Sequence, residues 1–159
     1  MKSKYINLLF IVSSLSFGGA EKQLITLVNQ LDTTRFRISL TYLKNDSELI
    51  SEVDCKRLEG RVFCCNVSNK FDIGAVRQLA QYIQDEAVDI IVCTNPYPLL
   101  YAWLARIVAR RRPRLMEIFH TTELDTFKSK LQMLFLYRPL FLISDMLVYV
   151  CKNQKNYWQ

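Results

Sequence analysis

The stretch YINLLFIVSSLSFGGAEKQL, residues 5–24, sets the architecture that the rest of the sequence repeats. Residues 5–12 form an almost unbroken apolar run, which is typical of a strand covered on both faces. Apolar side chains then recur at helical spacing over residues 20–31, so a helix is expected to start near Gly18 or Gly19. The stretch therefore predicts a buried strand that leads through a short loop directly into a helix.

The same alternation continues to the end of the chain. Strands are expected at residues 36–43, 61–65, 88–93, 114–119 and 146–150, and helices at 47–58, 71–85, 99–111 and 127–143, with another starting near Lys152. Parallel strands need crossover helices, so this order predicts a Rossmann-like, three-layer α/β/α fold with a mostly parallel sheet. Because no linker or repeat is visible, residues 1–159 are expected to form a single Rossmann-like domain.

Composition narrows the class of protein. The chain has 159 residues, 21 Lys and Arg against 15 Asp and Glu, a net charge of +6, and only four Gly and four Pro, which suits one folded domain. Its five cysteines lack CxxC spacing, which argues against a disulfide scaffold or zinc ribbon and favours a reducing compartment. One histidine excludes a multi-histidine metal site. No apolar run approaches the ~18–20 residues of a spanning helix, and no convincing signal-peptide cleavage site follows the first strand.

Polar, reactive or Gly-rich segments follow four of the expected strands. These segments are residues 13–21, 94–96, 120–123 and 151–153. Ligands of open α/β sheets bind outside the carboxyl ends of the strands. We therefore expect the four segments to converge on one rim.

Gly18 and Gly19 stand at the expected helix start. Free backbone amides and the positive end of the helix dipole favour an anion there, and the absence of Cβ atoms lets the backbone approach a ligand. A tight turn is the alternative reading of the pair, and capping of its own helix is the alternative for Glu21. The pair is neither a dinucleotide fingerprint nor a Walker loop, which argues against NAD and ATP as ligands.

His120 follows an expected strand directly, which puts it on the rim. An imidazole there can donate to a sugar hydroxyl or a phosphate oxygen, and it titrates near neutral pH. A purely structural role is the alternative. No carboxylate pair with glycosidase spacing and no nucleophile elbow can be read from the sequence.

Residues 11–24, IVSSLSFGGAEKQL, resemble the N-terminal domain of glycosyltransferase family 4, the retaining enzymes of the GT-B fold. Those enzymes begin with a strand followed by a Gly-Gly-x-Glu helix start. Three later segments agree in order, namely residues 89–95, 118–120 and 144–150. Cys151 stands where the family usually has serine, and Thr121 where an acid often follows the histidine, which leaves the roles of these two positions open.

The resemblance implies a role for each candidate residue. His120 would be catalytic, because it would bond to the transferring sugar and stabilise charge that develops at the anomeric centre. Contacts to the donor diphosphate or to the acceptor would come from Gly18, Gly19, Glu21, Thr94, Asn95 and Tyr97. Thr94, Asn95 and Tyr97 are assigned to the acceptor side.

The resemblance also implies what the protein works with. The family's enzymes have two Rossmann-like domains with the reaction between them, so this chain would be the N-terminal, acceptor-side domain, with the C-terminal donor-binding domain absent and the fragment alone inactive. It would use a nucleotide-sugar donor and a glycan or lipid-linked acceptor, without a metal or other cofactor. The resemblance also implies a role in polysaccharide biosynthesis and a cytoplasmic location. There are two alternatives. One is a non-catalytic or split half-domain that binds acceptor, lipid or a partner chain, and the other is a GT-B-fold sugar epimerase.

A cluster of five arginines and no acid spans residues 106–114. Such a patch attracts phosphates. Together with the apolar residues 127–143 it could dock the domain on the anionic inner face of the membrane, near a lipid-linked acceptor. A solvated helix end followed by a buried helix is the alternative. Nucleic acid is not an expected partner, because no aromatic residues are interleaved with the arginines.

Overall fold

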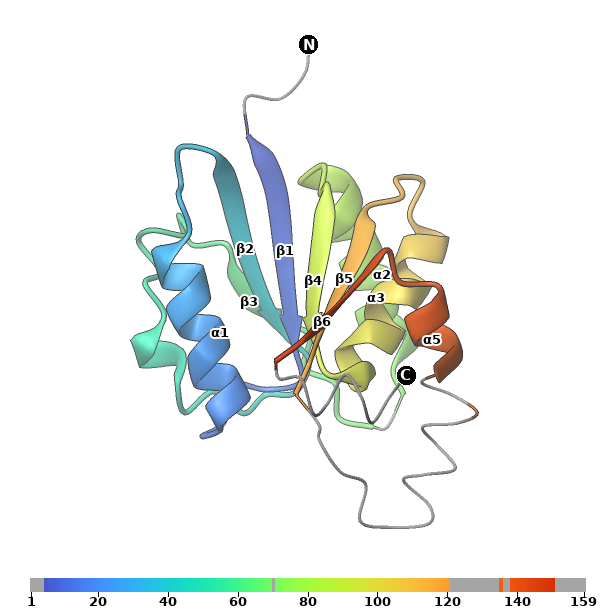
Figure 1. The fold of residues 1–159 in the computed structure, drawn as a ribbon, viewed down its shortest axis with the longest axis horizontal. Coiled ribbons are helices and arrows are strands. Elements are labelled where there is room, and N and C mark those ends of the chain that lie inside the picture. Colours follow the sequence, from blue (N-terminus) through green and yellow to red (C-terminus); the bar gives the residue numbers. More distant parts are fainter. Residues whose placement is uncertain (1–4, 70, 121–134, 136–137, 151–159) are drawn as a thin grey trace.

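A computed structural model describes residues 5–69, 71–120, 135 and 138–150. Six parallel strands form one sheet in the order β3-β2-β1-β4-β5-β6 (Figure 1). The strands are β1 (Ile6–Val12), β2 (Phe36–Tyr42), β3 (Val62–Cys64), β4 (Ile90–Thr94), β5 (Arg114–Phe119) and β6 (Met146–Tyr149). The predicted Rossmann-like α/β fold with a parallel sheet is confirmed.

Helices cover both faces of this sheet. They are α1 (Gly19–Gln30), α2 (Ile73–Asp85), α3 (Pro96–Val108) and the short α5 (Arg138–Leu142). Helix α2 starts where the Asp72 side chain accepts hydrogen bonds from the amides of Gly74 and Ala75, at 2.7 and 3.2 Å, which satisfies two donors that the helix itself leaves open. Helix α3 has Pro96 at its first position, where the missing amide hydrogen costs no helical hydrogen bond.

The central strand β1 supplies both cores. Leu9 and Ile11 point to the side of α2 and α3, whereas Phe10 and its neighbours on the same face pack with Leu24 of α1 and its apolar partners. All these side chains are almost fully buried. The continuous apolar run of the first strand is therefore a consequence of having helices on both faces.

The chain changes direction across the sheet between β1 and β4. From β1 it continues to β2 and β3 on one side, and then returns to β4, β5 and β6 on the other. The carboxyl ends of β1 and β4 lie next to each other, with Ile11 opposite Cys93. Such a switch point is where ligands of open α/β sheets bind, because the loops on its two sides diverge and leave a crevice.

The helix expected over residues 47–58 is wrong. Only Ile50–Glu52 forms a helical turn, of the 3-10 type. Tertiary partners bind the backbone of this segment: the Leu49 amide donates to Leu15 O at 2.8 Å, and the Asn29 side chain bonds both to the Glu52 carbonyl and to the amide two residues further on, two groups that an α-helix would use. Packing against α1 and the loop before it overrides the local helix propensity of this segment.

Other boundaries differ by a few residues. Helix α3 ends at Val108 instead of residue 111, because the extended backbone at Ala109 stops it before Pro113. Of the helix expected over residues 127–143, only α5 and its flanks fall within the described residues, and the helix expected from Lys152 lies outside them. Within the described part of the chain, none of the helices has the length and apolar character needed to cross a bilayer.

Candidate functional site

The loop between β1 and α1 is fixed by the segment that follows β2. The Leu15 amide donates to Asp46 O at 2.8 Å, and the Phe17 amide donates to the Glu48 carboxylate at 3.1 Å. Leu15 itself is fully buried. The loop therefore holds the start of α1 in one position at the carboxyl edge of the sheet.

The two glycines at this helix start have different surroundings. Gly18 is the N-cap, in an extended conformation that any residue adopts, and a Cβ atom there would lie 2.1 Å from Glu21 Oε2. At Gly19 a Cβ atom would meet no atom of the described residues within 4 Å. Gly18 thus makes room for the Glu21 carboxylate, whereas Gly19 presents its backbone to open space at the positive end of the helix.

His120 lies on the same face as α1, beyond the end of β5. It lines a hollow of about 150 Å³ with Thr94 and with side chains of α1 and β5, namely Gln23, Leu24, Leu27 and Ile118. Burial lowers the pKa of His120, and the nearby Glu21 carboxylate acts in the opposite direction. The ring is therefore neutral at pH 7, with one nitrogen that donates and one that accepts.

Asn95 has an unusual backbone between β4 and α3. Its φ of 73° and ψ of 158° lie in a region that residues with a side chain rarely enter. Its amide donates to Ile118 O at 3.2 Å, which ties it to β5. Its side-chain oxygen is buried and has no hydrogen-bond partner among the described residues. An acceptor held in a strained turn at the switch point is suited to a ligand donor.

Tyr97 faces the other layer of the domain. Its hydroxyl donates to that of Tyr101 at 3.4 Å, and the Lys44 ammonium lies 5.6 Å from its ring centre. Burial, followed by the hydrogen bond to Tyr101, raises the pKa of Tyr97 to about 12. Tyr97 therefore stays protonated and packs with the α2–α3 side of the molecule.

The structure brings His120 together with Thr94 and with Glu21 of the first turn of α1, and Asn95 directly follows Thr94 in the chain. Tyr97 contacts a different set of residues. Sequence analysis missed Gln23 and Leu27, which line the hollow one helical turn apart, and Glu48 and Lys44. Lys44 follows β2 at the same edge of the sheet, so the rule about carboxyl ends could have found it.

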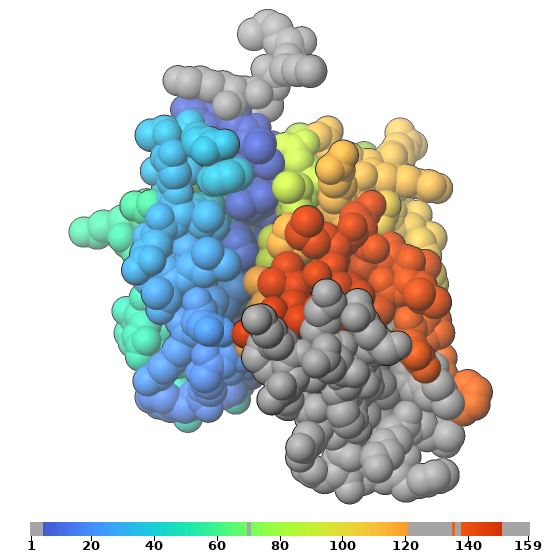
Figure 2. Space-filling view, viewed as in Figure 1, coloured from blue at the N-terminus to red at the C-terminus, as the bar shows by residue number. Residues whose placement is uncertain are grey.

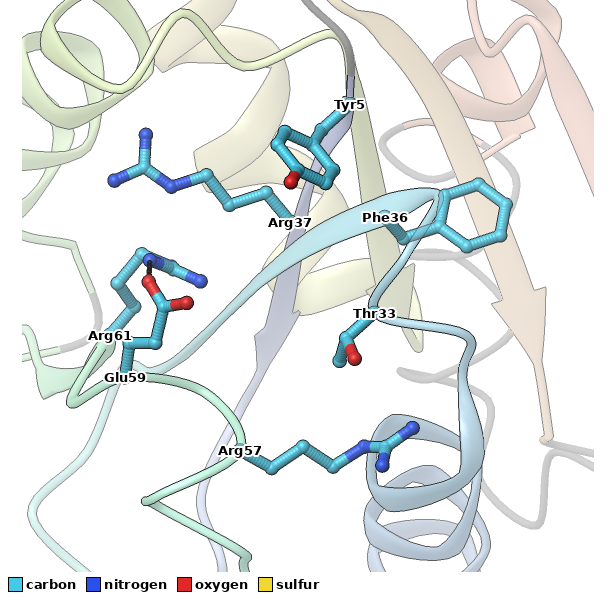
Figure 3. A pocket seen from close by; sticks show the side chains of 7 residues that line it. All are labelled: Tyr5, Thr33, Phe36, Arg37, Arg57, Glu59 and Arg61. Atoms are coloured by element: carbon cyan, nitrogen blue, oxygen red, sulfur yellow. Dashed lines mark hydrogen bonds and ion pairs between the residues drawn. The ribbon is translucent and has the colours of Figure 1, made fainter.

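A second hollow, of about 250 Å³, lies at the amino ends of β1 and β2 (Figure 3). Two of the arginines that line it make contacts that stabilise the fold. Arg57 donates to the last turn of α1 at Leu31 O, and Arg61 donates to Ile38 O at 3.1 Å and pairs with Glu59 at 2.5 Å. We therefore assign the candidate site to the carboxyl edge.

Metal ligands do not gather in the described part of the chain, where no group of three or more His, Cys, Asp or Glu side chains could hold an ion. The expectation of a metal-independent site remains a prediction.

Comparison with known proteins gives a family match and fold matches. The sequence profile of Glycosyltransferase Family 4 matches residues 17–159. The lipopolysaccharide outer core galactosyltransferase WaaB, in its apo form, is a similar solved structure, with 17% identity, a TM-score of 0.64, and coverage of 94% of this chain and 41% of that chain. A protein from Listeria monocytogenes described as a UDP-N-acetylglucosamine 2-epimerase has 12% identity and a TM-score of 0.62, and the match covers 96% of this chain and 40% of that chain. No curated protein sequence matches significantly.

The chain spans about two fifths of the length of these two proteins. Identities this low show a shared fold and leave the reaction open.

Proposed function

Because the chain belongs to glycosyltransferase family 4, we propose that it is the N-terminal, acceptor-side domain of a retaining glycosyltransferase. The enzyme transfers a hexose from a nucleotide-sugar to a glycan or a lipid-linked acceptor, without a metal. It works in the cytoplasm, on the inner side of the membrane. The observation that supports this proposal best is the position of His120, which lines one hollow with Thr94 and with Gln23, Leu24 and Leu27 of α1 at the carboxyl edge of the sheet.

His120 is the group that contacts the transferring sugar. A half-buried, neutral imidazole can accept a hydrogen bond from a sugar hydroxyl without first losing a proton. When positive charge develops at the anomeric centre, a hydrogen bond at this position is strengthened in the transition state. The Glu21 carboxylate, which raises the affinity of the ring for a proton, makes His120 a better hydrogen-bond acceptor as well.

The start of α1 contacts a phosphate or an acceptor hydroxyl. Gly19 has open space beside it, so a ligand oxygen can reach its amide and the helix end together. Thr94 and the buried oxygen of Asn95 are placed to accept from hydroxyl groups. Tyr97, with Lys44 over its ring, forms the more distant part of the acceptor side.

The decisive experiment compares the 159-residue chain with a longer protein that adds a donor-binding domain. We expect the chain alone to give no measurable sugar transfer, because one half of the cleft is missing. In the longer protein, His120→Ala is expected to lower kcat by about 10²-fold or more, while Gln78→Ala, an exposed change on α2, leaves it unaltered. Circular dichroism confirms that both variants fold. Wild-type turnover by His120→Ala would remove His120 from the mechanism.

An epimerase is the second candidate, favoured by the fold match to the Listeria protein. Incubation of the longer protein with a nucleotide-sugar and no acceptor distinguishes the two. A transferase releases nucleotide only when an acceptor is added, whereas an epimerase inverts a sugar carbon and leaves the nucleotide attached. Binding of acceptor without either reaction would indicate a non-catalytic half-domain.

A further inference from the structure

The hollow at the amino ends of β1 and β2 has more positive than negative groups around it. Among the described residues, its lining includes Arg37, Arg57 and Arg61 but a single acid, Glu59, and its volume is about 250 Å³. The arginines come from the start of β2 and from the turn before β3, so the fold brings them together (Figure 3). Figure 2 shows the starts of β1 and β2 at the surface, at the top of the view. A ligand from solution can therefore reach this end of the molecule.

Arg57 brings a donor without an acceptor to this hollow. One terminal nitrogen of its guanidinium donates to Leu31 O, just after α1, which fixes where the side chain lies. Its Nε, by contrast, is buried and has no hydrogen-bond partner among the described residues. Because a buried N–H without an acceptor is unfavourable, a bound molecule that supplies an oxygen atom here gains from a group that is already in place.

The other two arginines also keep donors for a ligand. A guanidinium has five N–H groups, and Arg61 uses one for Ile38 O at 3.1 Å and one for Glu59 at 2.5 Å. Arg37 forms an ion pair with Glu86 at 3.3 Å, but the Glu86 oxygen of this pair has no hydrogen-bond partner among the described residues. The fold thus positions both side chains and leaves most of their N–H groups available.

The acids at this end leave the positive charge largely uncompensated. Glu59 pairs with Arg61, but the Glu59 side chain is 71% exposed, so water screens the pair. Asp32, whose charge interacts with that of Arg57, accepts from the amide and the hydroxyl of Thr34 at 2.9 and 2.7 Å and is held in its own turn. The lining therefore has three positive charges against one negative charge.

We propose that this hollow, which we call the arginine hollow, binds the phosphate group of a small soluble molecule. Phosphate oxygens accept several charge-assisted hydrogen bonds at once, and the planar guanidinium matches their spacing. A phosphate monoester has a charge of about −1.5 to −2 at neutral pH, which balances the surplus on the lining. The volume of the hollow lies below the ~300–1,000 Å³ of sites for drug-sized ligands, so the arginine hollow suits a phosphate with a small substituent and excludes a whole nucleotide.

The arginine hollow is separate from the candidate site. It lies where β1 and β2 begin, whereas His120 and the start of α1 lie at the edge where parallel strands end. Strand β1 has seven residues, which span roughly 23 Å at ~3.3 Å per residue. A phosphate in the arginine hollow therefore does not touch a sugar at His120, and this inference does not depend on the proposed function. The ligand instead joins the start of β2 to the turn before β3.

The first test is a nuclear magnetic resonance titration of the isotope-labelled, 159-residue chain with potassium phosphate at neutral pH. We expect saturable shifts of the Arg57 Nε–H signal and of the amides of Thr33 and Arg37, and no such shifts with potassium chloride at the same ionic strength. A phosphate at the start of α1 would shift the Gly19 amide, so the two sites are read separately. Shifts confined to Gly19, or shifts that chloride reproduces, would overturn the proposal.

The second test compares the dissociation constant of phosphate among charge variants. Arg37→Gln changes a side chain that is 44% exposed, so the fold is retained, and it should weaken binding about tenfold. Glu59→Gln removes the opposing carboxylate and should tighten binding. Arg77→Gln, the same change at an exposed position on α2, is the matched control and should leave the constant unaltered. Equal weakening in Arg37→Gln and Arg77→Gln, or weaker binding in Glu59→Gln, would refute the assignment.

A third titration identifies the source of the phosphate group. Glycerol 3-phosphate is a monoester, whereas glycerophosphoglycerol is the soluble headgroup portion of a phosphodiester lipid and lacks the second negative charge. We expect the monoester to bind more tightly, because the lining has a surplus of more than one positive charge. Equal or tighter binding of the diester would assign the arginine hollow to a lipid headgroup and overturn the proposal of a small soluble ligand.

Discussion

A buried glutamate makes the stability of this domain depend on pH in a measurable way. Glu117 lies in the middle of β5 with none of its surface exposed, and its two neighbours on the same face, Leu115 and Phe119, are also buried. Neither carboxylate oxygen has a hydrogen-bond partner among the described residues. Burial raises the pKa of Glu117 well above its usual value, so the folded protein keeps its proton to a higher pH than the unfolded chain does.

The size of the effect follows from proton linkage. The unfolded chain releases this proton near pH 4.3, whereas the folded chain retains it to a higher pH. Stability is therefore fully present below about pH 4 and falls as the pH rises toward the pKa of the folded state. Within that window each pH unit lowers the free energy of unfolding by ~1.4 kcal/mol. Two pH units remove ~2.7 kcal/mol, a large share of the ~5–15 kcal/mol typical of a whole domain.

Glu117→Gln isolates this term, because it keeps the shape and removes the proton. Urea unfolding of wild type and variant is compared at about pH 5, 6 and 7, and we expect the stability of the variant to gain on wild type as the pH rises, by up to ~1.4 kcal/mol per pH unit until the folded-state pKa is reached. Glu117→Leu should be more stable still by about 1–3 kcal/mol, since it also removes the two unpaired oxygens. The exposed Glu52→Gln is the control, with no pH-dependent gain. Parallel curves for Glu117→Gln and wild type would refute the reasoning.

Two further predictions concern single groups. The chain has one histidine, so a nuclear magnetic resonance titration follows His120 alone. Its pKa should lie below ~6.5 and should fall further in Glu21→Gln, whereas Glu48→Gln should leave it unchanged, and an unchanged value in Glu21→Gln would separate the carboxylate from the ring. Asp72→Ala removes the acceptor for two amides at the start of α2 and should cost about 1 kcal/mol in urea unfolding, an effect that a mere change of surface charge would not produce.

The parts of the fold that depend on local pattern could be predicted from the sequence. The apolar run of β1 follows from burial on both faces, and the periodicity of α1 and α2 follows from one buried face each. The order of the strands could not be predicted, because it depends on which distant segments pair. The same limit explains the failure at residues 47–58, where bonds from Asn29 and Leu15, remote in sequence, replace those of a helix.

The candidate site was predictable to the extent that it depends on the ends of strands. His120 and Thr94 each follow or end a parallel strand, so the sheet itself brings them to one edge. The face on which a side chain lies is harder to infer. Thr94 points to α1, while Tyr97, only three residues later, belongs to α3 and contacts Lys44 and Tyr101. Helix α3 starts at Pro96, within those three residues. A sequence motif that spans this start cannot show that the side chains before and after it lie on different faces of the sheet.

The pair of glycines shows most clearly what geometry adds to a motif. In the sequence Gly18 and Gly19 are equivalent, and neither has a positive φ that would demand glycine. A methyl group at Gly18 would displace the end of the Glu21 side chain, and Glu21 acts on His120. A methyl group at Gly19 would enter space that none of the described residues occupies. Gly18 therefore leaves room for the Glu21 carboxylate that acts on the imidazole, Gly19 leaves an approach to the helix end, and the Gly-Gly-x-Glu spacing joins both effects at one helix start.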